Sequence, residues 1–476
     1  MADGLALWRW EDLVAAAGGI ADGVAASTIS GISIDTRSLE PGDVFVALKA
    51  ERDGHAFVPA AFERGAAAAI VSRDYARAPA DGPLIRVDDS LRALQQIGAA
   101  ARARLSPEAR VVAVTGSAGK TGTKEMLRAC LARAGSVHAA EKSYNNHWGV
   151  PLTLARMPLQ SRFAVLEIGM NHPGEITPLT RMARPHVAIV TNVLPVHLGQ
   201  FASEEEIAEA KAEIFAGLGR EGIAILNRDN RHFGLLEARA TNTGARIVSF
   251  GTAPSSSIRA SSMEAGPSGT DVTIAVAGRT LRYRIGAPGE HIAMNSLAVA
   301  AAIDVLGLPL EPCLAALADI SPPRGRGART TFRVPGGAIL LIDESYNANP
   351  ASMRAALAAM ATVPREAFPR RIAVMGDMLE LGEAAAEFHR GLKAAVDAAG
   401  VDLVFACGQN MRLLFDDLAP TRRAYWSERS VDLVDSLVAA LRPGDVVMIK
   451  GSLGTRMAPL VEAVRTRFGR DNGNAT

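Results

Sequence analysis

A glycine-rich turn that ends in a lysine and a threonine gives this chain a means of binding phosphate. The turn spans residues 115–121, TGSAGKT. At the start of a helix, successive backbone N–H groups and the helix dipole favour a polyphosphate. Lys120 would then reach the terminal phosphates, and the Thr121 hydroxyl would bind Mg²⁺. The predicted nucleotide-binding residues are Gly116, Ser117, Ala118, Gly119, Lys120, Thr121 and Gly122.

The residues that flank this turn decide between a nucleotide site and a glycine turn that binds nothing. Residues 111–114 form an apolar, β-prone run, and helix-forming residues follow from Lys124 onward. This strand, turn and helix are the context that a P-loop requires, although the turn is a shorter variant of the usual pattern. We therefore predict a nucleotide site.

A carboxylate and an imidazole lie where they could join Thr121 as ligands of Mg²⁺. Glu167 lies within the apolar segment 163–169, and burying it without a partner would be costly, so a cation is its natural neighbour. His197 follows the apolar segment 187–193. Taken alone, His197 is more typical of a structural histidine. Together with Glu167 and the phosphate loop, it predicts a site for one or two Mg²⁺ ions.

Three further polar clusters each allow two interpretations. Thr36 and Arg37 could bind a diphosphate or a sugar, or an Asp35–Arg37 pair could hold a turn. Asn145 and Asn146 could recognise a ligand rich in carbonyls or sugar, or form a satisfied Asx turn.

The third cluster is a helical pair, and a fourth feature is a group of arginines. His291 and Asn295, four residues apart, would share a helix face that could meet a purine or pack on a neighbour. Arg324, Arg326 and Arg329 lie beside glycines in a linker-like stretch and could form a phosphate clamp at a hinge.

Alternating strands and helices must position these residues. The strands predicted around the turn are 111–116, 137–140, 163–169, 187–193 and 223–227. Their pattern predicts an α/β fold with a parallel sheet, in which ligands gather at the carboxyl ends of the strands. Residues 330–476 form a second alternation of this kind, and a likely hairpin spans 271–277 and 281–285.

The length and composition predict a multidomain globular protein. With 476 residues, of which 48% are hydrophobic and 21% charged, two to four domains are expected. Breaks at Ser106-Pro107 and in the Gly- and Arg-rich stretch 321–327 divide the chain into domains 1–106, 107–324 and 325–476.

The charge and the cysteines exclude several classes of protein. A net charge of +1 gives no electrostatic reason to expect nucleic acid or an anionic membrane as a partner. No apolar run approaches the roughly 20 residues that cross a bilayer. The acidic N-terminal segment does not resemble a signal peptide, and three widely spaced cysteines fit a reducing cytoplasm. We expect a cytoplasmic monomer that acts on a small molecule.

The chain resembles the Mur ligase family over nearly its whole length. The resemblance is carried by VTGSAGKT, YNNHWGVPLT, EIGMNHPGEI, TNVLPVHL, KAEIF, GEHIAMNSLA, DESYNANPASM, GDMLELG and KGS, in this order, and by IDTRSLEPGDVFVAL earlier in the chain. It implies three domains: an N-terminal α/β domain that binds UDP, a central P-loop-type ATPase domain and a mobile Rossmann-like C-terminal domain.

DESYNANP and GDMLELG are the strings most specific to one branch of this family. That branch uses ATP and Mg²⁺ to join D-alanyl-D-alanine to UDP-N-acetylmuramoyl-tripeptide through an acyl phosphate, in peptidoglycan synthesis. The alternatives are a sibling ligase that adds a single amino acid and a P-loop ATPase switch that drives a partner.

The resemblance also implies roles for single residues. By spacing alone Lys211 reads as a solvated helix lysine, but in the family its position carries a carbamylated lysine that supports a second Mg²⁺. The resemblance assigns catalysis to Lys120, Glu167, His197 and Lys211, and the metal to Thr121, Glu167, His197 and Lys211. It assigns nucleotide contacts to Asn295 and Arg326 and the ribose to Asp343. The predicted substrate residues are Asp35, Thr36, Arg37, Asn145, Asn146, Tyr346, Asn347 and Asn349.

Overall fold

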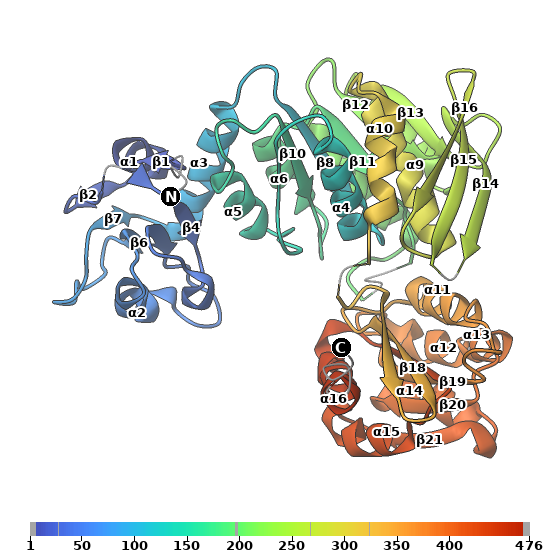
Figure 1. Ribbon diagram of the computed structural model, residues 1–476. Helices are drawn as coiled ribbons and strands as arrows, with labels where there is room; N and C mark the ends of the chain where they lie inside the picture. The colour runs from blue at the N-terminus through green and yellow to red at the C-terminus, as the bar shows by residue number, and fades with distance from the viewer. Residues whose placement is uncertain (1–5, 27, 196–198, 267, 323, 470–476) are drawn as a thin grey trace.

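The computed structural model of the protein describes residues 6–26, 28–195, 199–266, 268–322 and 324–469. Figure 1 shows three units in chain order, with the first (blue) beside the central unit (teal to yellow) and the third (orange to red) below the central one. Among the described residues, no helix combines the length and the apolar character that a membrane crossing needs.

The first unit is a five-stranded sheet with helices. Its strand order is β2-β7-β6-β5-β4, and only β2 pairs antiparallel with its neighbour. The strands are β2 (Ile20–Asp22), β4 (Gly31–Ser33), β5 (Asp43–Val46), β6 (Ala68–Ser72) and β7 (Leu84–Val87). The helices are α1 (Trp10–Ala17), α2 (Val58–Glu63) and α3 (Ser90–Ala103), and β1 (Trp8–Arg9) pairs with β3 (Thr28–Ile29).

The central unit is built on a nine-stranded sheet with the order β16-β15-β14-β13-β12-β11-β8-β10-β9. The strands are β8 (Arg110–Thr115), β9 (Val137–Ala139), β10 (Phe163–Glu167), β11 (Val187–Val190), β12 (Ile223–Asn227), β13 (Arg246–Gly251), β14 (Ile258–Gly266), β15 (Gly269–Val276) and β16 (Arg279–Ile285). The helices are α4 (Lys120–Leu131), α5 (Gly149–Ala155), α6 (Ile176–Ala183), α7 (Glu204–Ala212), α8 (Phe233–Thr241), α9 (Glu290–Val305) and α10 (Leu310–Leu314).

Strand β8 shows why this segment must lie inside a parallel sheet. Residues 111–115 are all buried, because helices cover both faces of the sheet. Successive side chains point to opposite faces, so Val112 and Val114 pack with residues of α4 and α9, whereas Val111 and Ala113 pack with residues of α6 and α7. The carboxyl end of β8 therefore delivers the glycine turn to one edge of the sheet.

The third unit is a six-stranded sheet with the order β17-β18-β22-β19-β20-β21. The strands are β17 (Ala328–Val334), β18 (Gly337–Glu344), β19 (Arg370–Gly376), β20 (Leu403–Cys407), β21 (Arg423–Ser427) and β22 (Asp445–Lys450). The helices are α11 (Pro350–Ala361), α12 (Ala385–Arg390), α13 (Lys393–Ala398), α14 (Gln409–Asp417), α15 (Val434–Ala440) and α16 (Ala458–Phe468). Only β17 pairs antiparallel with its neighbour.

The predicted α/β class and the parallel sheet are confirmed. The predicted hairpin corresponds to β15 and β16, but the structure adds β14, which pairs with both β13 and β15. Because half of the residues of β14 are polar or glycine, no apolar run marked it in the sequence. Positions 107 and 325 lie in connections between regular elements, before β8 and before β17.

Candidate functional site

A cleft of about 520 Å³ lies between the central and third units. Its walls come from the glycine turn and the carboxyl end of β10 on one side, and from loops of the third unit on the other. The predicted site residues that line it are Ser117, Ala118, Gly119, Lys120, Thr121, Gly122, Asn145, Asn146, Glu167, Asn295, Arg326, Tyr346, Asn347 and Asn349.

The glycine turn needs its two flanking glycines. Gly119 precedes α4 with a φ of +83°, and a Cβ there would lie 2.3 Å from the Asn295 amide nitrogen. A Cβ on Gly116, whose φ is +147°, would lie 1.9 Å from the Thr191 hydroxyl oxygen. The turn is thus packed against β11 and α9, and these contacts fix its shape.

Two amides of the turn are already bonded to protein groups. The Ser117 N–H donates to the Asn192 carbonyl at 3.0 Å, and the Ala118 N–H donates to the Asn192 side-chain oxygen at 2.9 Å. The amides left for an anion are therefore those at the start of α4, which have no carbonyl one turn earlier. We therefore expect an anion to bind at the N-terminus of α4 rather than along the whole turn.

Lys120 lies next to the predicted anion position. Its ammonium donates to the Gly116 carbonyl at 2.7 Å. Burial lowers the pKa of this lysine, the Glu167 carboxylate counteracts that shift and Arg326 adds to it. A polyphosphate would supply the negative charge that these cations lack.

A buried carboxylate and two hydroxyls form the centre of the site. Glu167, 2% exposed, ends β10, and the Thr121 hydroxyl donates to it at 2.9 Å. The Ser143 hydroxyl lies 2.7 Å from that of Thr121 and 3.2 Å from the other Glu167 oxygen. The Asn145 amide donates to the same oxygen at 2.8 Å. Sequence reasoning did not assign a role to Ser143, which lies two residues before Asn145 and belongs to no recognised motif.

This donor set fits Mg²⁺. The hydrogen bonds that Glu167 accepts from the described residues come from neutral groups, and the Lys120 charge interacts with it electrostatically. Among the described residues no three His, Cys, Asp or Glu side chains gather as a metal cluster. Mg²⁺ often binds one or two protein oxygens and completes its shell with water and phosphate oxygens, as Thr121, Ser143 and Glu167 would allow.

The two other residues predicted to bind metal are Lys211 and His197. Lys211 is 2% exposed near the end of α7, and burial, with the nearby Lys120 charge, holds its pKa well below the usual value. It is therefore not the solvated helix lysine that its spacing suggested. His197 lies outside the described residues.

Arg326 links the two walls of the cleft. Its guanidinium lies 4.0 Å from the centre of the Tyr346 ring and 3.4 Å from the Ser143 hydroxyl. Of the three arginines predicted as a clamp, it is the one that lines the cleft, whereas Arg324 is exposed and Arg329 donates to the Ala359 carbonyl. Asn295, beside Gly119, completes this end of the site, and His291 also lines the cleft.

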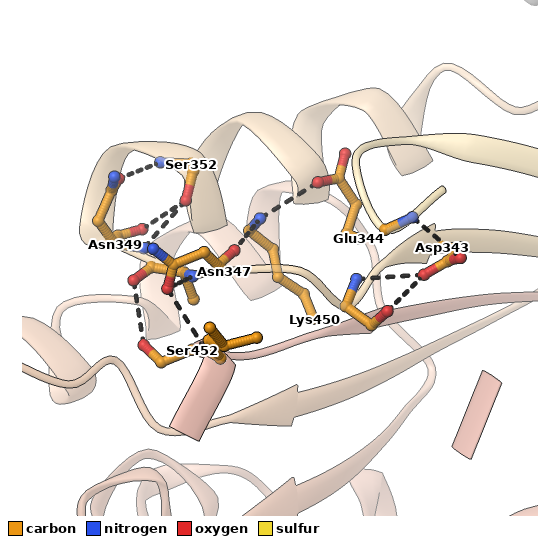
Figure 2. A network of polar contacts seen from close by, with 11 residues as sticks. Asp343, Glu344, Asn347, Asn349, Ser352, Lys450 and Ser452 are labelled. Carbon is orange, nitrogen blue, oxygen red and sulfur yellow. Dashed lines mark hydrogen bonds and ion pairs between the residues drawn. The ribbon is translucent and has the colours of Figure 1, made fainter. Parts of the chain in front are cut away.

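Figure 2 shows the polar network that shapes the third-unit wall. Lys450, 2% exposed at the end of β22, donates to the Glu344 carboxylate at 3.2 Å and to the Asn347 carbonyl at 3.0 Å. Asn349 and Ser352 form a capping box at the start of α11. The Asn347 side-chain oxygen accepts from the backbone of Ala348 and Leu453. These side chains hold the loops that face the cleft.

Asp343 does not line the cleft. Its carboxylate, 3% exposed, accepts hydrogen bonds from the Gly325 N–H at 3.1 Å and from the Ser345 hydroxyl at 2.7 Å, and Arg465 lies 3.3 Å away. Its observed contacts hold the connection that carries Arg326. A role in binding ribose stays a prediction.

The residues predicted to bind uridine lie in the first unit, away from the cleft. Asp35 and Arg37 form an ion pair at 2.6 Å, and Asp35 also accepts from the Arg37 N–H, so the short helix that begins at Thr36 is held by an Asp–Arg pair. This pair lowers the pKa of the Asp35 carboxyl. The structure thus shows the turn-holding alternative, and contact with a substrate stays a prediction.

Asn145 and Asn146 differ in which of the two predicted roles their contacts match. Asn145 donates to Glu167 inside the site. The Asn146 side-chain oxygen accepts from the Trp148 N–H at 3.4 Å, which is an Asx turn, and from the Gly149 N–H at 2.9 Å at the start of α5. Asn146 still lines the cleft.

Matches to known protein families identify the family of this chain. Three family models match the chain: the Mur ligase family catalytic domain over residues 28–102, the Mur ligase middle domain over 114–303, and the Mur ligase glutamate ligase domain over 329–453. This chain belongs to the Mur ligase family.

Curated Mur ligases resemble the chain over nearly its full length. The UDP-N-acetylmuramoyl-tripeptide--D-alanyl-D-alanine ligase of Bacillus subtilis (strain 168) is 34% identical over 92% of this chain and 93% of its own length. The enzyme of the same name from Escherichia coli (strain K12) is also 34% identical, over 92% of this chain and 94% of its own.

Solved Mur ligase structures share the whole arrangement. MurF from Acinetobacter baumannii superimposes with a TM-score of 0.82 at 29% identity, covering 96% of this chain and 99% of that one. MurF from Thermotoga maritima in complex with ADP gives a TM-score of 0.76 at 26% identity, covering 93% and 98%. The predicted three-domain Mur ligase architecture is therefore confirmed.

Proposed function

We propose that this Mur ligase joins D-alanyl-D-alanine to UDP-N-acetylmuramoyl-tripeptide with ATP, through an acyl phosphate, in peptidoglycan synthesis. The names of its full-length relatives support the substrates. One observation carries the chemistry: a buried carboxylate, Glu167, faces the P-loop hydroxyl of Thr121 at the edge of a cleft that a second unit closes.

The first step must overcome repulsion between two anions. An oxygen of the tripeptide's terminal carboxylate attacks the γ-phosphorus of ATP, and the bond from that phosphorus to the ADP oxygen breaks. Catalysis of this step comes mainly from positioning and charge neutralisation. The N-terminus of α4 and the cations of Lys120 and Arg326 would bind the phosphates and offset their charge.

We propose Thr121, Ser143 and Glu167 as the residues that hold Mg²⁺, with His197 and Lys211 serving a second ion. The ion would neutralise negative charge on the phosphates that Lys120 also binds. The MurF structure from Thermotoga maritima in complex with ADP supports nucleotide binding by this fold.

In the second step the neutral amine of D-alanyl-D-alanine attacks the acyl carbon. A C–N bond forms through a tetrahedral intermediate, the C–O bond to phosphate breaks, phosphate leaves with that electron pair, and the amine loses its extra proton. Water would destroy the acyl phosphate, so the cleft has to close around it. The polar network of Lys450 and Asn347 shapes the wall that would close.

We also propose that the enzyme works in the cytoplasm. All three cysteines are unpaired and buried, which fits a reducing compartment. A monomeric state stays a prediction.

Phosphate release with ATP, UDP-N-acetylmuramoyl-tripeptide and D-alanyl-D-alanine tests the function when each is omitted in turn. We expect every omission to abolish release. Lys120→Ala should also abolish it, whereas Lys393→Ala, on the exposed helix α13, should leave it unchanged. Release that needs a single amino acid would indicate a sibling ligase, and release without any amine would indicate an ATPase switch.

A further inference from the structure

The motif GDMLELG, residues 376–382, forms a loop whose residues Leu379, Glu380 and Leu381 line the cleft. The loop follows β19. Its backbone is fixed by two side chains: the Met378 N–H donates to the His389 Nε2 at 2.9 Å, and the Leu379 N–H donates to the Ser452 hydroxyl at 2.9 Å. Such contacts leave the middle of the loop little freedom.

His389 is a fixed support inside the third unit. It is fully buried, and its Nδ1 lies 2.6 Å from the Ala385 carbonyl oxygen. Nδ1 therefore carries the proton, and Nε2 is free to accept from Met378. The ring connects helix α12 to the loop through one tautomer.

The loop also reaches the central unit. The Gly199 N–H donates to the Glu380 carbonyl at 3.3 Å. Glu380 has a φ of +65°, an uncommon conformation for a residue with a side chain. This hydrogen bond connects the loop to the central unit at the residue that follows Leu379.

Leu379 is an apolar side chain that stays open to the cleft. It is 42% exposed although its backbone is held, and it lines the cleft together with Leu453 and Gly454. A Cβ on Gly454 would lie 2.7 Å from the Leu379 Cδ1, so the glycine leaves room for this leucine. An isobutyl group can offer no hydrogen bond or charge to a phosphate, a ribose or a carboxylate.

We propose that Leu379 contacts the side chains of the acceptor dipeptide and limits their size, and that His389 is a positioning residue for this contact. The inference rests on the proposed function. The groups proposed to bind phosphate lie at the start of α4, and the residues predicted to contact the nucleotide, Asn295 and Arg326, lie near Gly119 and Lys120. We therefore assign the third-unit wall beside Leu379 to the acceptor. The methyl groups of D-alanyl-D-alanine are the apolar parts of that substrate that a leucine can pack against.

Two substitutions on either side of the same contact should act in opposite directions. Leu379→Ala opens the wall, whereas Gly454→Ala pushes the flexible end of Leu379 into the cleft. We would measure kcat/KM for D-alanyl-D-alanine and for D-alanyl-D-norvaline, whose second side chain is longer. Leu379→Ala should shift the ratio about 10-fold toward the longer dipeptide, and Gly454→Ala should shift it away, a range typical of single methylenes in apolar pockets.

The double variant and a surface control sharpen this test. In the Leu379→Ala background, Gly454→Ala should no longer change the ratio, because the colliding atoms are gone. Leu159→Ala removes a leucine of similar exposure, 49%, from outside the cleft and should leave the ratio at the wild-type value. A ratio that Leu379→Ala leaves within about twofold of wild type would overturn the proposal.

Variants of His389 test its role through the Michaelis constants for the dipeptide and for ATP. His389→Leu removes the acceptor of the Met378 N–H and should raise KM for the dipeptide more than KM for ATP, and His389→Gln should restore part of the loss. Equal changes in both constants, or none, would refute the positioning role.

If wild-type protein shows no acceptor-dependent phosphate release, the proposed function itself fails. If the protein ligates the dipeptide and only the kcat/KM ratio is insensitive to Leu379→Ala, the inference alone fails.

Discussion

At the scale of single residues, the site depends on a buried carboxylate, Glu167, whose described hydrogen-bond donors are all neutral. The described partners of Glu167 are two hydroxyls and an amide, at 2.8 to 3.3 Å. A buried negative charge held this way is costly unless a cation joins it. The arrangement is therefore better explained by ion binding than by stability.

Glu167→Gln tests this explanation because it keeps the size of the side chain and removes its charge. We expect kcat to fall at least about 100-fold, which corresponds to roughly 2.7 kcal/mol of transition-state stabilisation. The Mg²⁺ concentration needed for half-maximal activity should rise as well. The melting temperature, measured alongside, should stay close to that of wild type; unchanged Mg²⁺ dependence would argue against the ion site.

Lys211 provides a second residue-scale prediction. Burial lowers its pKa, so the amine is more often neutral and able to react with CO₂ to give a carbamate. Lys211→Ala should be nearly inactive and should recover part of its activity with short carboxylic acids that mimic the carbamate. Full wild-type activity in bicarbonate-free buffer would count against carbamylation.

At the scale of elements, the turn between β8 and α4 determines where phosphate can bind. Two of its amides are held by Asn192, so the start of α4 is left to meet the anion. The sequence predicted the strand, the turn and the helix because these are local patterns. It could not show which amides are occupied, since Asn192 lies in the loop after β11, more than 70 residues later.

Two glycines three positions apart in this element should respond to alanine in opposite ways. Gly119→Ala places a side chain at positive φ, at a cost of about 1–2 kcal/mol before the clash with Asn295, and should weaken ATP binding. Gly122→Ala meets nothing within 4 Å and, inside α4, should stabilise the fold by about 0.5–1 kcal/mol. Urea denaturation measures both; equal signs would contradict the geometry described for the turn.

Other parts of the site show the same limit of sequence reasoning. Asn145 and Asn146 are adjacent and chemically identical, yet one donates to Glu167 and the other holds a turn. Ser143 was missed because its importance comes from its distance to Thr121, and Asp343 turned inward because Gly325 and Ser345 offer it donors. Motifs predicted the fold and the phosphate loop, whereas contacts between distant segments decide the individual roles.

At the scale of the whole molecule, the first two units are packed together and the third faces the central unit across the cleft. The Trp8 indole N–H donates to the Ala155 carbonyl at 2.9 Å, and the Arg104 guanidinium lies 3.6 Å from the centre of the Trp8 ring. Arg102 adds hydrogen bonds to carbonyls at the end of α6. Through these contacts the first unit would present the UDP-linked substrate to the phosphate loop.

His186, which lies between α6 and β11 and bonds to the start of β8, should make global stability depend on pH. Its Nδ1 accepts from the Val111 N–H, and burial, with Arg102 and Arg110 nearby, lowers its pKa from 6.5 to about 4. Between these values the unfolded chain binds more protons, so stability should fall as the pH falls from 6.5 toward 4. His186→Asn keeps an acceptor without titrating. Urea denaturation across this range should show a shallower loss for the variant, and identical curves would exclude His186 as a cause.

The transfer of oxygen from the tripeptide to phosphate tests the central claim most directly. UDP-N-acetylmuramoyl-tripeptide labelled with oxygen-18 in its terminal carboxylate would be ligated to D-alanyl-D-alanine, and the released phosphate examined by mass spectrometry. An acyl phosphate formed at the γ-phosphorus predicts that each phosphate carries one labelled oxygen. Phosphate without the label would contradict the account.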